Sequence, residues 1–192
     1  AGTGRNLDFI VDRVRKDSKE KSGEPLMHLD VTDYSPNMIQ QAYVKYKRME
    51  KKQKFKYDGI QFKLADAHNL DLPERYYDTV FDTYGLCSFE NPEQVLREMV
   101  KVCKDDGQII LLEHGRVDKR KTWFYHNWLN RYLDKTCEAR AKNWGCWWNR
   151  DIEQIVNNCN DVLEVTSQQT HQFGTCYLII GKPIRKNEAV VV

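Results

Sequence analysis

The chain has 192 residues, of which 41% are hydrophobic and 30% are charged, a composition typical of a globular domain with a full apolar core. Its net charge of +2 is too small to require a nucleic-acid partner, and the sequence contains no long apolar run that predicts a membrane-spanning helix. None of the six cysteines forms a C-x-x-C pair, so the sequence favours reduced thiols and predicts no metal site.

The chain opens on a glycine-rich turn, Ala1-Gly2-Thr3-Gly4, which leads into a predicted helix over residues 5–11. Glycine suits such a loop because the backbone turns sharply and a ligand can approach where a Cβ atom would collide. A strand normally precedes a loop of this kind. We therefore expect the first strand to be missing from these residues, and the loop to hold its ligand weakly without it.

Short apolar runs then alternate with helical segments. Strands are predicted over residues 26–31, 60–65, 77–83 and 108–112, and helices over residues 37–52 and 92–104. Ser35-Pro36 and Asn91-Pro92 each supply an N-cap followed by proline at the first helical position, and Asp106-Gly107 predicts a turn. This alternation predicts an α/β fold with a mostly parallel, Rossmann-like sheet.

The C-terminal part has a different pattern. A helical insert rich in Trp and Tyr is predicted over about residues 118–160, followed by strands over 162–170 and 176–181. The short connection at 171–174 predicts that these two strands pair antiparallel. We expect one domain over residues 1–184, with a polar loop at 16–25 and a frayed tail at 185–192.

Acidic residues follow two of the predicted strands. Asp33 comes after the strand at 26–31, where a carboxylate can accept hydrogen bonds from both hydroxyls of a ribose. Asp66-Ala67 comes after the strand at 60–65, where a carboxylate can receive an adenine amino group and a backbone N–H can read the ring. With the glycine loop, three strand ends are therefore expected to bind an adenosine.

The glycine loop also indicates which adenosine ligand to expect. A dinucleotide fingerprint needs a small third residue in G-x-G-x-x-G, and Leu7 stands at that position, which disfavours NAD and FAD. A P-loop is excluded because no Gly-Lys-Ser/Thr follows.

Several segments together resemble the class I S-adenosylmethionine (SAM) methyltransferases. Residues 1–7 resemble the first motif without its leading acid and first glycine, and 33–38 resemble the second-strand acid with the cap of the next helix. The remaining similar segments are residues 66–70, 77–86 and 96–107. The chain is most similar to the UbiE-type branch, it resembles methyltransferase-like thiol S-methyltransferases at 86–88 and 112–115, and it is similar to fungal mitochondrial inner-membrane methyltransferases of the Oxa-suppressor type.

This resemblance implies SAM as cofactor and a transferase that moves its methyl group. The residues that it places at the cofactor are Gly2, Thr3, Gly4, Asp33, Tyr34, Asp66, Ala67 and Tyr84. Tyr84 either faces the positive sulfonium in a cation–π contact or packs under a lid. His114 either accepts a proton from the methyl acceptor, oriented by Glu113, or is a hydrogen-bonded structural residue. Cys87 is expected to be a small buried side chain.

The acceptor is expected to be small or lipid-like. In the insert, Phe124, Trp128 and Tyr132 recur every four residues and predict one apolar helix face. Three interpretations of this face stay open: packing on the domain, a lid over an apolar substrate, or contact with a membrane surface.

A basic run over residues 45–56 predicts a solvated helix face, with RNA or anionic lipid as the alternative. The alternative function is accordingly a methyltransferase-fold binding or assembly factor that contacts RNA or a mitochondrial membrane complex. By resemblance the protein is expected at the mitochondrial inner membrane or in the matrix, with any anchor upstream of these residues, and the cytoplasm is the alternative.

Overall fold

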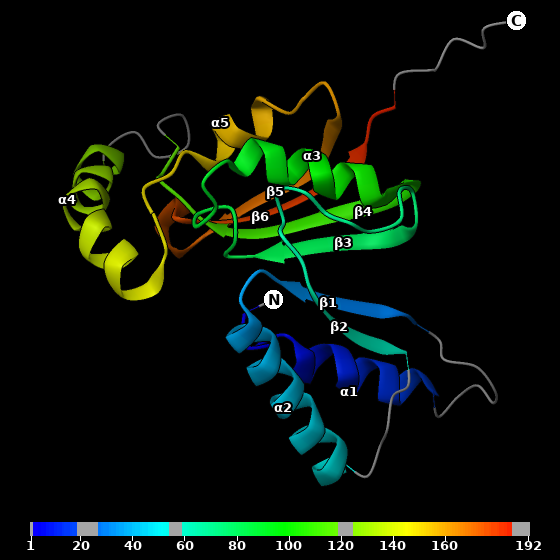
Figure 1. Cartoon of the computed structure of the whole chain (residues 1–192). Helices are drawn as coiled ribbons and strands as arrows, with labels where there is room; N and C mark the ends of the chain where they lie inside the picture. Colours follow the sequence, from blue (N-terminus) through cyan, green and yellow to red (C-terminus); the bar gives the residue numbers. More distant parts are fainter. Residues whose placement is uncertain (1, 19–26, 54–58, 119–124, 186–192) are drawn as a thin grey trace, which may run out of the picture. The chain divides into compact units, whose positions relative to one another are not determined.

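The computed structural model describes residues 2–18, 27–53, 59–118 and 125–185 (Figure 1). By its internal contacts the chain divides into two compact units, residues 1–67 and 68–192, and each is described here by itself. The single domain predicted over residues 1–184 therefore stays a prediction. The helices in the described ranges include none with the length and apolar character needed to cross a membrane.

The first unit contains two helices and a small parallel sheet. Its elements are α1 (Leu7–Ser18), β1 (Leu29–Asp33), α2 (Pro36–Gln53) and β2 (Ile60–Leu64). β1 and β2 pair in parallel, with Leu29 opposite Ile60 and Asp33 opposite Leu64. The predicted helix at 5–11 is thus longer than expected, because α1 includes residues 16–18 of the predicted polar loop, and the rest of that loop lies outside the described residues.

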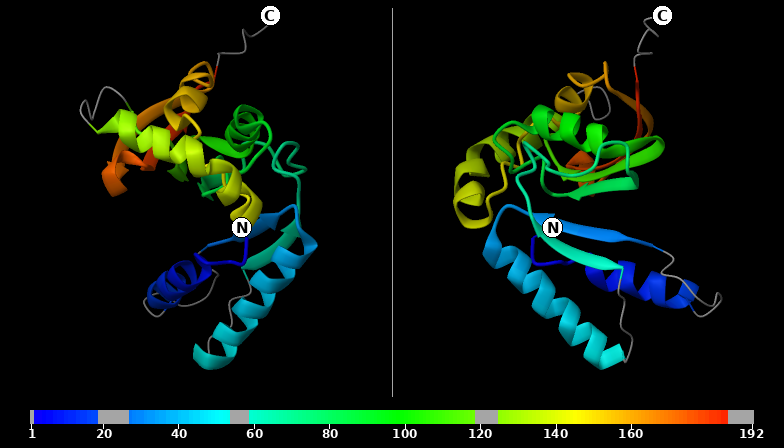
Figure 2. Two further views of the ribbon diagram at one scale, coloured as in Figure 1. Left: turned by 90° about the vertical axis from the view of Figure 1, so that its left-hand side faces the viewer. Right: turned by 45° about the vertical axis from the view of Figure 1, so that its right-hand side comes forward.

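Helix α2 contacts both strands and α1 contacts α2, and Figure 2 shows the two helices on the same side of the strands. The buried residues of this core come from α1, β1 and α2, and they are Leu7, Val11, Leu29, Val31, Ala42, Tyr46 and Met49. On the α2 side these residues recur at three- and four-residue spacing, which is the apolar stripe of an amphipathic helix. Ser35 begins α2 as predicted, and its hydroxyl accepts a hydrogen bond from the Met38 N–H at 3.4 Å.

The second unit is built on a four-stranded mixed sheet. Its elements are β3 (Tyr77–Thr83), α3 (Pro92–Val102), β4 (Cys103–His114), α4 (His126–Trp144), α5 (Ile152–Asn157), β5 (Leu163–His171), a 3₁₀ turn (Gln172–Gly174) and β6 (Cys176–Pro183). The strand order is β3-β4-β6-β5. β3 and β4 are parallel, whereas β6 is antiparallel to both β4 and β5, so the predicted C-terminal hairpin and the fold class are confirmed.

The β3–α3–β4 segment follows its sequence signals closely. Asn91 caps α3 by accepting a hydrogen bond from the Gln94 N–H at 3.2 Å, and Pro92 occupies the first turn. Val95, Leu96 and Met99 lie on the buried face of α3, which packs on the sheet beside α5 (Figure 1). Because β3 and β4 pair in parallel, their carboxyl ends lie at one edge of the sheet.

The predicted turn at Asp106-Gly107 and the predicted tail at Arg185 both need correction. β4 begins at Cys103, and Tyr77 pairs with Cys103 while Thr79 pairs with Gln108, so residues 104–107 form an irregularity inside the strand pair. Arg185 is ordered because its guanidinium donates to the Asp105 carboxylate at 2.9 Å and to the Val100 and Cys103 carbonyls at 2.8 Å. The remaining tail, 186–192, lies outside the described residues.

Helix α4 leaves the aromatic rings of its predicted apolar face exposed, which disagrees with one of the three interpretations, packing on the domain. Its buried residues are Asn130, Leu133 and Cys137, whereas Trp128 is 71% exposed and Tyr132 is 49% exposed. Phe124 lies outside the described residues. Asn130 is tolerated inside because its amide bonds the backbone of Val117 on both sides, accepting from the N–H at 2.8 Å and donating to the C=O at 3.0 Å.

Replacing Asn130 by leucine should lower the free energy of unfolding by about 2 kcal/mol, because the buried N–H and C=O of Val117 lose their partners. Chemical denaturation monitored by circular dichroism measures this loss. Asn127→Leu, at an exposed position of the same helix, is the matched control and should leave the midpoint nearly unchanged. Equal midpoints for the two variants would contradict the structural role of Asn130.

Candidate functional site

The glycine loop at residues 2–4 needs glycine at two positions for different reasons. Gly4 has φ +71°, and a Cβ atom there would lie 2.6 Å from Leu7 Cδ1 and 3.1 Å from Ala42 Cβ. Gly4 therefore lets α1 approach α2. Gly2 has φ +56°, and a Cβ atom on it would meet no described atom within 4 Å. Gly2 thus serves the turn itself, and Thr3 beside it is exposed.

Asp33, at the end of β1, holds this loop directly. Its Oδ2 accepts a hydrogen bond from the Gly2 N–H at 2.7 Å, and its Oδ1 accepts one from the Ser35 N–H at 2.9 Å. Partial burial raises the pKa of Asp33, but the hydrogen bonds from Ser35 and Gly2 outweigh it, so the pKa lies below its ordinary value. The carboxylate is therefore ionised at neutral pH. A carboxylate of this kind at the end of a strand can accept hydrogen bonds from the two hydroxyls of a ribose.

Asp66-Ala67 follows β2 at the same edge of the parallel sheet. The Ala65 N–H donates to the Asp33 carbonyl at 3.0 Å, so the carboxyl ends of β1 and β2 lie side by side. Asp66 and Tyr34 are exposed there, Tyr34 at 75%. The structure thus brings the predicted residues of the first unit together at one sheet edge.

Lys45, in the predicted basic run, also supports the glycine loop. Its ammonium donates to the Gly4 carbonyl at 2.9 Å and pairs with the Asp8 carboxylate at 2.6 Å. Lys47 pairs with Glu50 one turn further along α2, at 2.8 Å. These two basic side chains therefore have partners within the first unit, and the run's last residues, 54–56, lie outside the described ranges.

Tyr84 and His114 lie together in the second unit. Tyr84 follows β3, His114 ends β4, and their rings stack with centroids 4.2 Å apart and planes 21° apart. The Tyr84 N–H donates to the Leu112 carbonyl at 2.8 Å, and the Tyr84 backbone has φ +60°. A non-glycine residue in this left-handed conformation is strained, and such residues cluster at functional sites.

Glu113 does not orient His114 as the sequence suggested. Its side chain is fully buried and accepts hydrogen bonds from the N–H groups of Gly85 at 3.3 Å and Cys87 at 3.4 Å. Burial, with the nearby Asp82 carboxyl, raises the pKa of Glu113 well above its ordinary value, and burial also raises the pKa of Asp82. The two acids therefore retain a proton between them, and the hydrogen bonds to Glu113 fix the loop after β3. Successive residues of a strand face opposite sides, so Glu113 points away from His114.

Three side chains that are distant in the sequence also lie close together beside this loop. The thiols of Cys87 and Cys146 lie 3.1 Å apart, and Cys146 Sγ lies 3.8 Å from His114 Nδ1. The thiol–thiol hydrogen bond lowers the pKa of Cys146 and raises that of Cys87, so the pair shares a proton. Sequence reasoning missed this cluster because its members are 27 and 32 residues apart, without the short C-x-x-C spacing of common metal sites.

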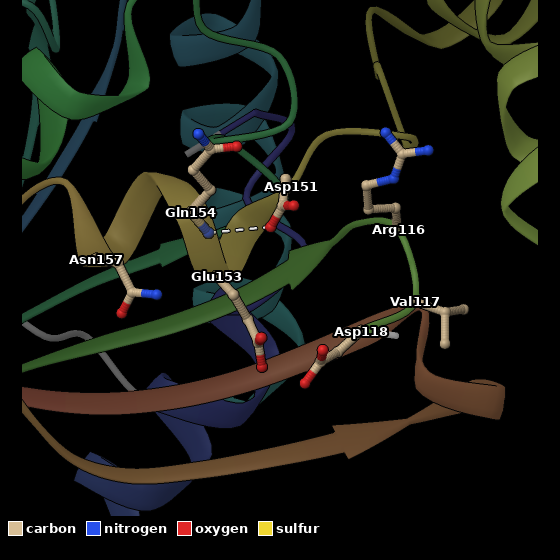
Figure 3. Close-up of a pocket in the computed structure, with 7 residues that line it drawn as sticks. All are labelled: Arg116, Val117, Asp118, Asp151, Glu153, Gln154 and Asn157. Atoms are coloured by element: carbon tan, nitrogen blue, oxygen red, sulfur yellow. Dashed lines mark hydrogen bonds between the residues drawn. The ribbon is translucent and has the colours of Figure 1, made fainter. Parts of the chain in front are cut away.

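A surface pocket of about 490 Å³ lies elsewhere in the second unit (Figure 3). It is lined by Arg116, Val117, Asp118, Asp151, Glu153, Gln154 and Asn157. Asp151 caps α5 by accepting from the Gln154 N–H at 3.0 Å, and Glu153 accepts from Gln168 Nε2 at 2.5 Å. These polar groups therefore hold α5 in place, and the pocket is separate from the predicted site residues.

Comparisons with known proteins agree with this arrangement. A family described as "Methyltransferase domain" matches residues 19–111. The mitochondrial methyltransferase OMS1 of Saccharomyces cerevisiae is 32% identical over 196 residues, which cover 94% of this chain and 36% of OMS1. The chain thus spans about a third of the length of that relative.

Two further matches concern the branch and the fold. The ubiquinone/menaquinone biosynthesis C-methyltransferase UbiE of Chromobacterium violaceum is 37% identical over 62 residues, 32% of this chain and 25% of UbiE. The crystal structure of a SAM-dependent methyltransferase from Aquifex aeolicus superposes with a TM-score of 0.60 at 14% identity, covering 95% of this chain and 78% of that one. The chain therefore has the Rossmann-like fold of the SAM-dependent methyltransferases and is similar to methyltransferases over most of its length.

Proposed function

We propose that the protein transfers the methyl group of SAM to a small or lipid-like acceptor. The observation that carries the cofactor part is the ionised Asp33 carboxylate at the end of β1, which accepts a hydrogen bond from the glycine loop through the Gly2 N–H. The acceptor part is supported by the partial similarity to UbiE, whose name specifies carbon methylation in quinone biosynthesis.

Each residue has its own role in cofactor binding. Asp33, with Tyr34 beside it, accepts hydrogen bonds from the ribose hydroxyls, and Asp66 and Ala67 bind the adenine. The loop formed by Gly2, Thr3 and Gly4 holds the methionine portion. When bound, SAM supplies a methyl group that is already activated by its sulfonium, so positioning provides much of the acceleration.

Tyr84 and His114 act on the reacting groups in this proposal. The Tyr84 ring offers its face to the sulfonium, a cation–π contact worth about 0.5–2 kcal/mol. The His114 imidazole accepts the proton that leaves the acceptor, and the Tyr84 ring stacked on it at 4.2 Å fixes its plane.

Exposed aromatic rings on α4 support an apolar acceptor or a membrane surface. Trp128 and Tyr132 stack at 6.5 Å and both are exposed, and Trp144 at the end of the helix is 77% exposed. Such rings suit the boundary between water and an apolar phase. The named relative OMS1 is mitochondrial, which supports a location at the mitochondrial inner membrane or in the matrix, with the cytoplasm as the alternative.

Replacing His114 by glutamine should lower kcat about 100-fold in a transfer assay with radiolabelled SAM and a mitochondrial extract as source of acceptors. The extract is then separated into lipid, small-molecule, RNA and protein fractions, and the label in each fraction is counted. His171→Gln, an exposed histidine in β5, is the matched control and should keep wild-type activity.

Label in lipid or small molecules that depends on His114 supports the proposal. Label in RNA or protein would overturn the acceptor class. No transfer, together with RNA binding that survives Asp33→Ala, would instead favour the alternative of a binding or assembly factor. Lys45 and Lys47 pair with carboxylates inside the first unit. The basic run therefore supports the binding-factor alternative less than the sequence alone suggested.

A further inference from the structure

We propose that Cys87, His114 and Cys146 bind one zinc ion, with a fourth position left for water or another small ligand. This site goes beyond methyl transfer but shares His114 with the proposed function, so the role of His114 as a zinc ligand and its role as a proton acceptor are alternatives. Among the described residues these three form the group of potential ligands whose donor atoms all lie within 4.8 Å of one another.

The fold places the three ligands from separate segments. Cys87 lies in the loop after β3, His114 ends β4, and Cys146 follows α4 just after Gly145. The Trp147 N–H donates to the Cys87 carbonyl at 2.9 Å, and Arg150 donates to the Leu86 carbonyl at 3.1 Å. One hydrogen bond between backbone groups and one from the Arg150 guanidinium therefore hold the Cys146 segment against the Cys87 loop.

The distances are close to those of a zinc site. With Zn–S of about 2.3 Å and Zn–N of about 2.0 Å in a tetrahedron, two sulfurs lie about 3.8 Å apart, and sulfur and nitrogen about 3.6 Å apart. The Cys146–His114 separation of 3.8 Å fits, and the Cys87–Cys146 separation of 3.1 Å needs to widen by less than about 1 Å. A loop and a chain turn carry the two cysteines, so such a shift leaves the sheet in place.

Charge and burial also favour a cation here. Cys87 is 0% and Cys146 is 8% exposed, and two thiolates this close would repel each other in a buried environment. A divalent ion compensates both charges, whereas a proton compensates only one. Soft thiolates with an imidazole are ligands that zinc prefers, and three protein ligands with an open position are typical of catalytic rather than structural zinc.

Zinc on Nδ1 changes the role of His114. The coordinated imidazole is neutral and carries its proton on Nε2, so His114 then donates a hydrogen bond and does not accept a proton. The stacked Tyr84 ring fixes the imidazole plane, as neighbours of metal ligands do. Metal content therefore decides between His114 as a proton acceptor and His114 as a ligand.

A disulfide between Cys87 and Cys146 is the competing interpretation. It requires the sulfurs to approach to about 2.05 Å, a movement of about 1 Å, and it leaves His114 without a function in the cluster. The convergence of an imidazole on the two thiols is what favours the ion.

The experiment uses the protein purified with a non-chelating reductant. Elemental analysis should give one zinc per chain, and Co²⁺ replacing it should produce thiolate-to-cobalt charge-transfer absorption. Cys146→Ser should weaken zinc affinity about tenfold or more in competition with a chromogenic chelator, and Cys87→Ser should do the same. Cys159→Ser is the matched control, because Cys159 is also buried but its thiol donates to the Glu93 carbonyl, away from the proposed site.

Circular dichroism of each variant checks that the fold is kept, and the wild-type metal content tests the proposal even where a variant fails to fold. Less than about a tenth of an equivalent of zinc after incubation with equimolar Zn²⁺ would overturn the site. So would equal affinity in the Cys146→Ser and Cys159→Ser variants. A Cys87–Cys146 disulfide found by mass spectrometry in protein that binds no zinc would establish the competing interpretation.

Discussion

Replacing Asp33 by alanine should weaken binding of S-adenosylhomocysteine about 100-fold or more, as measured by titration calorimetry. The substitution removes the charged acceptor proposed for two ribose hydroxyls and releases the Gly2 N–H, which donates to Asp33 Oδ2 at 2.7 Å in the wild type. Hydrogen bonds to a charged group are worth about 1.5–3 kcal/mol each, and each 1.4 kcal/mol corresponds to tenfold in affinity.

Asp33→Asn separates the two contributions. The amide keeps one acceptor oxygen and the side-chain shape but loses the charge, so we expect a loss of about tenfold. Asp71→Asn, an exposed carboxylate of the second unit, is the control and should bind like the wild type. If Asp33→Ala bound as tightly as Asp71→Asn, Asp33 would not hold the ribose.

Replacing Glu113 by alanine should lower the free energy of unfolding by about 3 kcal/mol at neutral pH. The N–H groups of Gly85 and Cys87 lose their acceptor inside the protein, and a cavity is left at a fully buried position. Urea denaturation measures the loss. Glu113→Gln keeps an acceptor and resembles the protonated acid, so it should lose clearly less.

The same pair of variants tests the protonation of this acid through the pH dependence of stability. The pKa of Glu113 is raised in the folded protein, so the folded state keeps a proton that the unfolded state releases above its ordinary pKa of 4.5. The stabilisation is complete below that value and is lost as the pH rises towards the folded pKa. Between pH 5 and 8 the wild type should therefore lose stability more steeply than Glu113→Gln. Parallel slopes would show that Glu113 ionises normally.

Local signals in the sequence predicted much of the fold. β3, the caps of α2 and α3 and the C-terminal hairpin depend on residues that are near one another in the chain, and these are confirmed. Asp33 and Asp66 could be chosen because parallel strands end at one sheet edge, so their position after a strand was informative. Whether they bind SAM stays a prediction.

The features that were missed depend on contacts between distant segments. Asn130 is buried because the Val117 backbone, 13 residues earlier, satisfies its amide, and this cannot be read from a hydrophobic pattern. The regular spacing of aromatic residues predicted that α4 is a helix, but it did not predict which side of the helix is buried. Glu113 and Asp82 lie 31 residues apart, and the three ligands of the proposed zinc site come from three loops or strand ends.

The backbone at Tyr84 has a consequence for how the enzyme balances stability against activity. Glycine adopts φ +60° without strain, whereas a tyrosine there raises the free energy of the folded state by about 1 kcal/mol. The chain accepts this loss at one of the two residues proposed to act in methyl transfer. A variant selected only for thermal resistance would be expected to relax this position, at the expense of the aromatic ring proposed to face the sulfonium.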